Sequence, residues 1–304
     1  KEGNRCVGVE IDQKSGRSTV RARNVVICDG GFQANHDLLR EFITKHPEKL
    51  KQRGAGISVG DGLKMARGIG ARIVGMDHFY GHTLCREAMH NNQLWPYPTV
   101  DSLCTAGVVV DAEGRRFVDE GKGGVYIANC VAKLDDPLAA TVIFDDEIWN
   151  GSARQGVFPC NPLLLSVGAT IFSAPDLPSL AAKLALPGEV LQATIDQFNA
   201  MVDANQAQEL KPSRTTSKHK ARAIRKPPYR AIQICAGITY TMGGLAIDGA
   251  ACVLDEANEV MPGLYAAGCA VGGIEGWGYA GYIGGLVRSA VTALLAANHI
   301  ARTG

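Results

Sequence analysis

Residues 24–35 read NVVICDGGFQAN, a short apolar run that ends close to a pair of glycines. The run at 25–27 predicts a buried strand. Gly30 and Gly31 have two explanations. Glycine adopts φ > 0 at little cost, so the pair can form a tight turn. Alternatively, a ligand must approach the main chain closely there, as happens at the carboxyl ends of parallel strands. The rest of the chain has to decide between these explanations.

The composition is that of a protein with a substantial core. The chain has 304 residues, 46% of them apolar, and a formal net charge of +1. At about 150 residues per domain, this length suggests two domains. The near-neutral charge argues against nucleic acid or an anionic membrane as a partner. No apolar run reaches the roughly 18 residues that a membrane-spanning helix needs.

Nine cysteines are scattered along the chain without a C-x-x-C pair. This pattern argues against a disulfide framework and against a metal site, and it favours the reducing cytoplasm. Residues 1–16 contain no signal-peptide core. Residues 5–31 resemble a hairpin followed by a buried strand, with no element before them. We therefore expect the sequence to be a fragment of a longer protein.

The hydrophobic pattern alternates between strand and helix periods. Strands are predicted at 5–31 and from 231 onward, and helices at 34–46, 60–74, 177–184, 187–207 and 284–301. Residues 213–228, SRTTSKHKARAIRKPP, are basic and poor in apolar residues. We interpret this stretch as a solvated loop, and binding of an anionic partner is the less favoured alternative.

Dinucleotide-binding motifs are absent from the sequence. The best approximation to G-x-G-x-x-G is GAGISVG at 54–60, which has the wrong spacing and follows no apolar strand. A glycine-rich segment near the end is more informative. Residues 263–286, GLYAAGCAVGGIEGWGYAGYIGGL, combine a strand, a turn at Gly268 and a helix that opens at Gly284. A helix N-terminus exposes free N–H groups, so it could hold an electron-rich ligand; the alternative is a plain surface turn.

Six blocks in order resemble the succinate dehydrogenase/fumarate reductase flavoprotein family. They are VVICDGGF (25–32), GDGLKMARGIGA (60–71), GHT (81–83), VVVDAEGRRFVDE (108–120), YTMGGLAID (240–248) and GLYAAG…GG (263–285). In that family the G-x-G-x-x-G motif lies upstream of anything present here. The resemblance implies an α/β plus α+β protein that binds FAD. Without the motif, we expect this chain alone to bind FAD weakly or not at all.

The resemblance also implies which residues face the cofactor. Gly30 and Gly31 would lie along FAD, and Asp61 would contact it. Gly268 leads to Cys269, where relatives usually have Glu. The helix aimed at the flavin would start at Gly284, Gly285, Leu286 and Val287.

Three departures from the family pattern bear on the substrate. Gly124, Tyr240 and Tyr282 stand where dicarboxylate-reducing relatives keep Arg, His and Arg. Losing cations disfavours a dianionic substrate. The aromatic residues expected around the site are Tyr80, Trp95, Tyr97, Tyr126, Tyr240, Trp277, Tyr279 and Tyr282. This composition favours a neutral or bulky apolar substrate with a ketone or enone, as in related ketosteroid dehydrogenases; core packing is the alternative for each aromatic.

From this resemblance we expect Tyr240, or else Tyr126, to transfer a proton if its pKa is lowered from about 10. His82 would orient a small-molecule substrate, and an electron partner is implied. Residues 1–80 and 241–304 would be a partial FAD-binding domain, and 81–240 an inserted capping domain. The competing hypothesis is a flavin-free structural or binding remnant without catalysis.

Overall fold

The computed structural model describes residues 1–14, 16–276 and 282–303. The chain divides into two units, which are described separately. Unit 1 comprises Lys1–Ile43, Gly54–Tyr80 and Thr239–Gly304, and unit 2 comprises Thr44–Arg53 and Gly81–Ile238. The assignment of these units to an FAD-binding domain and a capping domain stays a proposal. Residues 44–53, which we had placed with the first segment, lie in unit 2.

Unit 1 is built on a small mixed sheet in the order β12–β13–β3. The apolar run that opened the sequence analysis forms β3 (Val25–Ile27), which pairs in parallel with β13 (Val260–Ala266). The strand β12 (Cys252–Leu254) pairs antiparallel with β13. The parallel pairing brings the carboxyl ends of β3 and β13 to the same edge of the sheet. Both glycine-rich segments of the sequence follow these two ends.

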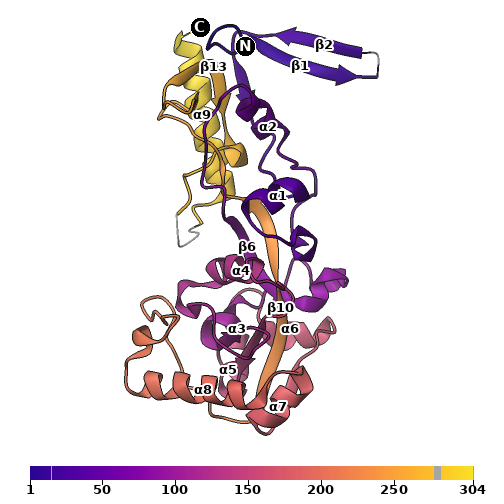
Figure 1. The fold of residues 1–304 in the computed structure, drawn as a ribbon, viewed down its shortest axis with the longest axis vertical. Coiled ribbons are helices and arrows are strands. Elements are labelled where there is room, and N and C mark those ends of the chain that lie inside the picture. Colours follow the sequence, from indigo (N-terminus) through magenta and orange to yellow (C-terminus); the bar gives the residue numbers. More distant parts are fainter. Residues whose placement is uncertain (15, 277–281, 304) are drawn as a thin grey trace. The chain divides into compact units, whose positions relative to one another are not determined.

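Three helices of unit 1 are relevant to the site: α1 (His36–Phe42), α2 (Asp61–Gly68) and α9 (Gly285–Thr303). Figure 1 shows α9 alongside β13. Its Thr292 and Ala296 are buried, whereas Leu286 is 89% exposed. The remaining strands are the antiparallel hairpin of β1 (Gly8–Gln13) and β2 (Gly16–Arg21), and the pair of β5 (Ile73–Val74) and β11 (Gly244–Leu245).

Unit 2 surrounds a sheet in the order β4–β10–β8–β7, with β6 and β9 also pairing with β10. Its strands are β4 (Lys51–Gln52), β7 (Val108–Val110), β8 (Thr141–Phe144) and β9 (Phe172–Ala174). Its helices are α3 (Asp101–Ala106), α4 (Gly124–Ala132), α5 (Asp146–Asn150), α6 (Cys160–Ser166), α7 (Leu177–Leu184) and α8 (Gly188–Asp203). Every residue of β7 and β8 is buried. These strands are therefore central to the core of unit 2.

Two strands carry the chain from one unit to the other. They are β6 (Phe79–Cys85) and β10 (Tyr229–Thr241). The mixture of helices and sheets confirms the predicted α/β fold class. No helix in the described part of the chain is both long and apolar enough to traverse a lipid bilayer.

Candidate active site

The glycine pair after β3 packs against the protein itself. Gly30 has φ +97°, a conformation that favours glycine. A Cβ on Gly31 would lie 2.2 Å from Thr241 Oγ1. The same hydroxyl oxygen accepts a 3.0 Å hydrogen bond from the backbone N–H of Phe32. The pair is thus explained by a turn and by Thr241, and contact of Gly30 or Gly31 with FAD stays a prediction.

The carboxylate of Asp29 fixes the start of α2. It accepts a 2.7 Å hydrogen bond from the backbone N–H of Gly62. A Cβ on Gly62 would lie 2.4 Å from this carboxylate, so the close approach requires glycine. Asp61, expected to contact the cofactor, has a side chain that is 65% exposed and pairs with Lys64 at 2.8 Å. Asp61 lies near the carboxyl end of β3, and its cofactor contact stays a prediction.

The second glycine-rich segment begins directly after β13. Gly268 has φ +65°, and its N–H donates to Thr292 Oγ1 on α9 at 2.9 Å. Cys269, at the position where relatives usually have Glu, is partly buried. Burial raises the pKa of its thiol, and Arg288 partly opposes that shift. Cys269 is therefore a protonated thiol at neutral pH rather than a thiolate nucleophile.

The N-terminus of α9 fits an electron-rich ring edge, such as that of a flavin. Gly284 has φ +100°, and the first intrahelical hydrogen bond runs from Arg288 N to the Gly284 carbonyl. The N–H groups of Leu286 and Val287 lie in the first turn, where no intrahelical acceptor exists. Both side chains are exposed, at 89% and 60%. The predicted helix start is where we expected it, and its exposed end suits the partial negative charge of a reduced flavin.

A buried polar cluster links this helix to β10. Glu275 Oε1 accepts a 2.7 Å hydrogen bond from the Tyr240 hydroxyl, and Oε2 accepts a 2.6 Å bond from Arg288 Nη1. The side chains of Glu275 and Arg288 are fully buried. Arg288 Nε donates to the Gly268 carbonyl, and its guanidinium lies 5.2 Å from the centre of the Tyr240 ring. The cluster therefore holds β10, the Gly268 turn and α9 together.

The environment of Tyr240 does not meet the condition that we set for proton transfer, a lowered pKa. Burial and the hydrogen bond to Glu275 instead raise the pKa of Tyr240 well above its usual value. Tyr240 is thus a hydrogen-bond donor at neutral pH and cannot serve as a tyrosinate base. Whether it takes part in catalysis stays a prediction.

Aromatic rings surround Tyr240. The ring of Tyr80 stacks on Tyr240 with centroids 5.2 Å apart, and on Tyr282 with centroids 4.3 Å apart. The Tyr282 hydroxyl accepts a 3.3 Å hydrogen bond from Gly285 N at the start of α9. Tyr240 and Tyr282, the two tyrosines expected at cationic positions of the family pattern, thus belong to one aromatic stack. Trp277 and Tyr279 lie outside the described residues.

Sequence reasoning missed Glu275 and Arg288. Glu275 lies within the glycine-rich segment, and Arg288 is the only charged residue among the first sixteen of α9. A single charge within this otherwise uncharged stretch of the helix was the available signal. Pairing across 13 residues could not be inferred, because a glycine-rich segment with no periodicity separates the two.

In unit 2, His82 belongs to a second polar group. Its Nδ1 lies 2.5 Å from Asp101 Oδ2. The other carboxylate oxygen of Asp101 accepts hydrogen bonds from the Thr83 N–H and hydroxyl, at 2.8 and 2.6 Å. Asp101 therefore fixes the orientation of the His82 ring.

Tyr126, the alternative proton-transfer residue, lies in the first turn of α4. Its ring is 4.7 Å from the Lys122 ammonium nitrogen, in a cation–π arrangement. Gly124, where relatives keep Arg, precedes it, and a Cβ at Gly124 would lie 2.1 Å from Asp101 Cγ. The catalytic role of Tyr126 stays a prediction.

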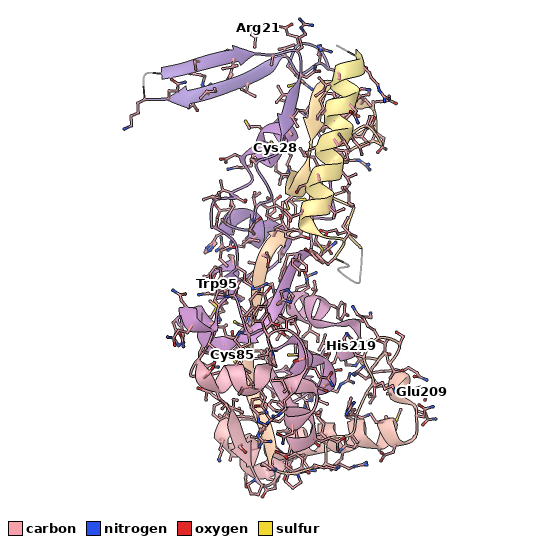
Figure 2. The ribbon with its side chains drawn as sticks, turned by 180° about the vertical axis from the view of Figure 1, so that it is seen from behind. Arg21, Cys28, Cys85, Trp95, Glu209 and His219 are labelled. Atoms are coloured by element: carbon pink, nitrogen blue, oxygen red, sulfur yellow. The ribbon has the colours of Figure 1, made fainter. Side chains whose placement is uncertain are left out.

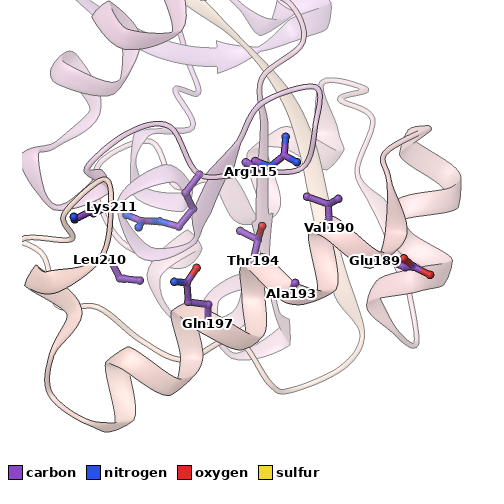
Figure 3. A pocket seen from close by; sticks show the side chains of 9 residues that line it. Arg115, Glu189, Val190, Ala193, Thr194, Gln197, Leu210 and Lys211 are labelled. Atoms are coloured by element: carbon purple, nitrogen blue, oxygen red, sulfur yellow. The ribbon is translucent and has the colours of Figure 1, made fainter.

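A cavity of 410 Å³ lies elsewhere in unit 2 (Figure 3). The residues that line it come mainly from α8, with Arg115 and Lys211 from two loops. Its Arg116 is held by Glu120 at 2.6 Å. None of the residues predicted for the active site lines this cavity, and we assign it no role. Within the described residues, no group of three His, Cys, Asp or Glu side chains could hold a metal ion.

Comparison with known proteins relates these features to a family. Residues 1–282 match the family model described as the FAD binding domain. A fumarate reductase (cytochrome) of Shewanella frigidimarina is 28% identical over 275 residues, 84% of this chain and 42% of that protein. A 4-oxocyclohexanecarboxylate 2-dehydrogenase of Sinomonas cyclohexanicum is 28% identical over 305 residues, 92% of this chain and 51% of that protein. The chain spans 26% to 51% of the length of these and similar curated relatives.

A solved structure shows the same fold. The crystal structure of 3-ketosteroid Δ1-dehydrogenase from Sterolibacterium denitrificans, in complex with 1,4-androstadiene-3,17-dione, aligns with a TM-score of 0.72 and 23% identity. The alignment covers 99% of this chain and 57% of that one. Together with the family match, these relatives confirm the resemblance to the fumarate reductase flavoproteins and FAD as the cofactor. This chain belongs to the FAD binding domain family.

Proposed function

We propose that the protein is an FAD-dependent oxidoreductase that transfers a hydride between flavin and a carbonyl-activated substrate other than a plain dicarboxylate. The aromatic, charge-compensated cluster around Tyr240 carries this proposal. Its cation, Arg288, is already paired with Glu275 and fully buried. A dianion would find tyrosines where relatives keep cationic or potentially cationic groups. Two similar proteins, the 4-oxocyclohexanecarboxylate 2-dehydrogenase and the 3-ketosteroid Δ1-dehydrogenase, support a ketone substrate.

The residues that would hold FAD follow the two parallel strands. They are Gly30, Gly31 and Asp61 after β3, with Gly268, Cys269 and the start of α9 after β13. FAD supplies the hydride acceptor or donor when it is bound. The protein's contribution is the positive end of the α9 dipole, offered by Gly285, Leu286 and Val287 to the ring edge that becomes negative on reduction.

The side chains would orient the substrate and hold protons. The Tyr240 hydroxyl donates a hydrogen bond to Glu275, and Arg288 stabilises the charge of that carboxylate. The Tyr240 oxygen can accept a hydrogen bond from a substrate group, and the raised pKa keeps the hydroxyl protonated at neutral pH. In unit 2, Asp101 orients His82, which we propose as the residue that positions the substrate.

Tyr240→Phe in the full-length protein tests the role of Tyr240. We expect turnover of a ring ketone to fall roughly 10²-fold while the melting temperature changes little. Tyr229→Phe, the same change on the same strand, is the matched control and should keep full turnover. Unchanged turnover in Tyr240→Phe, with stability lowered by about 1 kcal/mol, would assign Tyr240 to the core.

Two further measurements test the reaction class. The full-length protein should turn over fumarate far more slowly than a ring ketone, because each lost charged contact to a dianion costs about 2–5 kcal/mol. Fumarate turnover equal to that of its relatives would contradict the proposal. For this chain alone we expect weak or no FAD retention, measured by the flavin absorbance of the purified protein. A full-length protein that also lacks flavin would favour the alternative of a non-catalytic remnant.

A further inference from the structure

We propose that unit 2 contains a binding subsite for the carboxylate group of a small organic ligand, built from the basic segment 213–226. The subsite is a 560 Å³ pocket with hydroxyl, amide and basic side chains in its wall. Lys218, His219, Lys220 and Arg222 line it on one side, and Asp101 and Gly124 on the other. The composition of this segment had predicted a solvated loop.

Hydrogen bonds from Arg214, whose side chain is fully buried, fix the backbone of the basic segment. Arg214 Nη1 donates to the carbonyls of Thr215 and His219, and its Nη2 donates to that of Lys220. The Asp119 carboxylate accepts a further 2.9 Å bond from the Thr215 N–H. With its carbonyls turned inward to Arg214, the backbone between 215 and 220 is fixed beside the pocket. Figure 2 labels His219 on this loop.

The opposite side of the pocket includes the backbone of Gly123 and Gly124 together with the Asp101 side chain. Gly123 has φ +100° and precedes α4, whose first turn has no side-chain cap. A Cβ on Gly124 would collide with the Asp101 carboxylate, so no larger residue fits there. The cationic groups of the pocket therefore come from the basic segment on its other side. His219 contributes a mostly neutral ring, since burial and the cations Lys218 and Arg214 lower its pKa.

The charge balance of the pocket favours an anion. Arg222 lies 3.8 Å from Glu147, and Asp101 is engaged by His82 and Thr83. Among the described residues, Lys218 and Lys220 form no ion pair, so their charges are not compensated within the protein. Two uncompensated cations match one carboxylate in a charge-assisted contact. The pocket volume leaves room for an apolar body attached to that carboxylate.

This inference deepens the proposed function. The subsite is argued from the pocket alone, and only the identification of its ligand as the substrate rests on the proposed function. The substrate would then be a ketone or enone with a single carboxylate. That class differs from the dicarboxylates disfavoured above and from the neutral compounds expected from the sequence.

Binding of cyclohexanecarboxylate, compared with neutral and isosteric cyclohexanecarboxamide, tests the subsite. Titration calorimetry at low salt uses the whole chain and the Lys218→Gln/Lys220→Gln variant. We expect the acid to bind the unmodified chain and the variant to bind it at least about tenfold more weakly. Raised salt should weaken binding to the unmodified chain more than to the variant, because exposed charges are screened.

Lys45→Gln/Lys211→Gln removes the same charge from exposed positions of unit 2 outside the pocket, and it should bind like the unmodified chain. Equal affinities for acid and amide, equal binding in both double variants, or no binding at about 10 mM acid would each overturn the inference. Flavin retention and ketone turnover are separate readouts. Normal turnover without acid binding would therefore reject the subsite alone, and acid binding without turnover would reject the proposed function alone.

Discussion

Each unit of this protein buries a glutamate against arginine, and the two pairs differ in what else they contact. In unit 2, Glu120 binds Arg116 at 2.6 Å, with Arg214 3.8 Å away. In unit 1, Glu275 binds Arg288 at 2.6 Å. All these side chains are at most 5% exposed. Burial and ion pairing alone therefore do not distinguish a structural pair from a functional one.

The third partner makes the difference. Glu120 Oε1 accepts from the Val109 N–H, and Arg116 donates onward to the carbonyls of Pro212 and Val118. These hydrogen bonds join the loops of Pro212 and Val118 to β7, and all three involve backbone groups of the partner residue. Glu275 accepts instead from Tyr240, a titratable residue in an aromatic stack beside the start of α9. The pair in unit 1 thus acts on a group that can carry or release a proton.

The largest loss in the free energy of unfolding is expected for Glu120→Gln. The substitution removes the carboxylate that lies between two buried guanidiniums, those of Arg116 and Arg214. Breaking a buried pair costs about 3–5 kcal/mol. Denaturant unfolding should show a midpoint lowered accordingly, or an unfolded chain. Glu113→Gln, at an exposed turn of the same sequence block, should leave the midpoint unchanged. If both variants unfold alike, Glu120 is not the structural element that we describe.

A smaller loss is expected for Glu275→Gln, about 2–3 kcal/mol, because one guanidinium is left and the amide still accepts a hydrogen bond. The pKa of Tyr240 should fall toward its usual value, since the carboxylate contributes to raising it. Ultraviolet difference titration against Glu275→Gln/Tyr240→Phe isolates this tyrosine. If Tyr240 titrates in Glu275→Gln as it does in the unmodified chain, Glu275 does not act on Tyr240, and the two glutamate–arginine pairs do not differ in the way that we describe.

The raised pKa of Tyr240 should make the free energy of unfolding depend on pH in the alkaline range. The native state keeps a proton that the unfolded state releases above pH about 10, so stability is constant below that pH and falls above it, by about 1 kcal/mol per pH unit. Buried cysteines with raised pKa values, such as Cys235, add to this trend. The informative quantity is therefore the difference in pH slope between the unmodified chain and Tyr240→Phe. Tyr229→Phe should reproduce the unmodified slope.

The smallest net change in the free energy of unfolding is expected for the double variant Glu275→Gln/Arg288→Met. Removing both buried charges together avoids the cost of an uncompensated one, so stability should return to within about 1–2 kcal/mol of the unmodified chain. Glu120→Gln/Arg116→Met should not recover in this way, because Arg214 stays buried without its partner. Equal recovery of both double variants, measured by denaturant unfolding, would contradict the comparison.

Local patterns predicted much of the fold. The run at 25–27 forms a strand, and the glycines at 284–285 open a long helix. The ordered blocks pointed to the family, which the match over residues 1–282 confirms. The interpretation of 213–228 as a solvated loop missed its buried anchor, because Arg214 is fixed by carbonyls that only the folded loop brings together.

The sequence by itself determined where strands, turns and helix starts fall, because periodicity and glycine conformations are local properties of the chain. Only the tertiary structure decided what each group contacts. It assigned the close approach at Gly31 to Thr241, 210 residues away in the chain, and it joined Tyr240 to Glu275 and Arg288. Hydrogen bonds between such distant groups depend on how the strands are paired. For the same reason the direction of the Tyr240 pKa shift could not be read from the sequence, because its burial and its carboxylate neighbour are not encoded next to it in the chain.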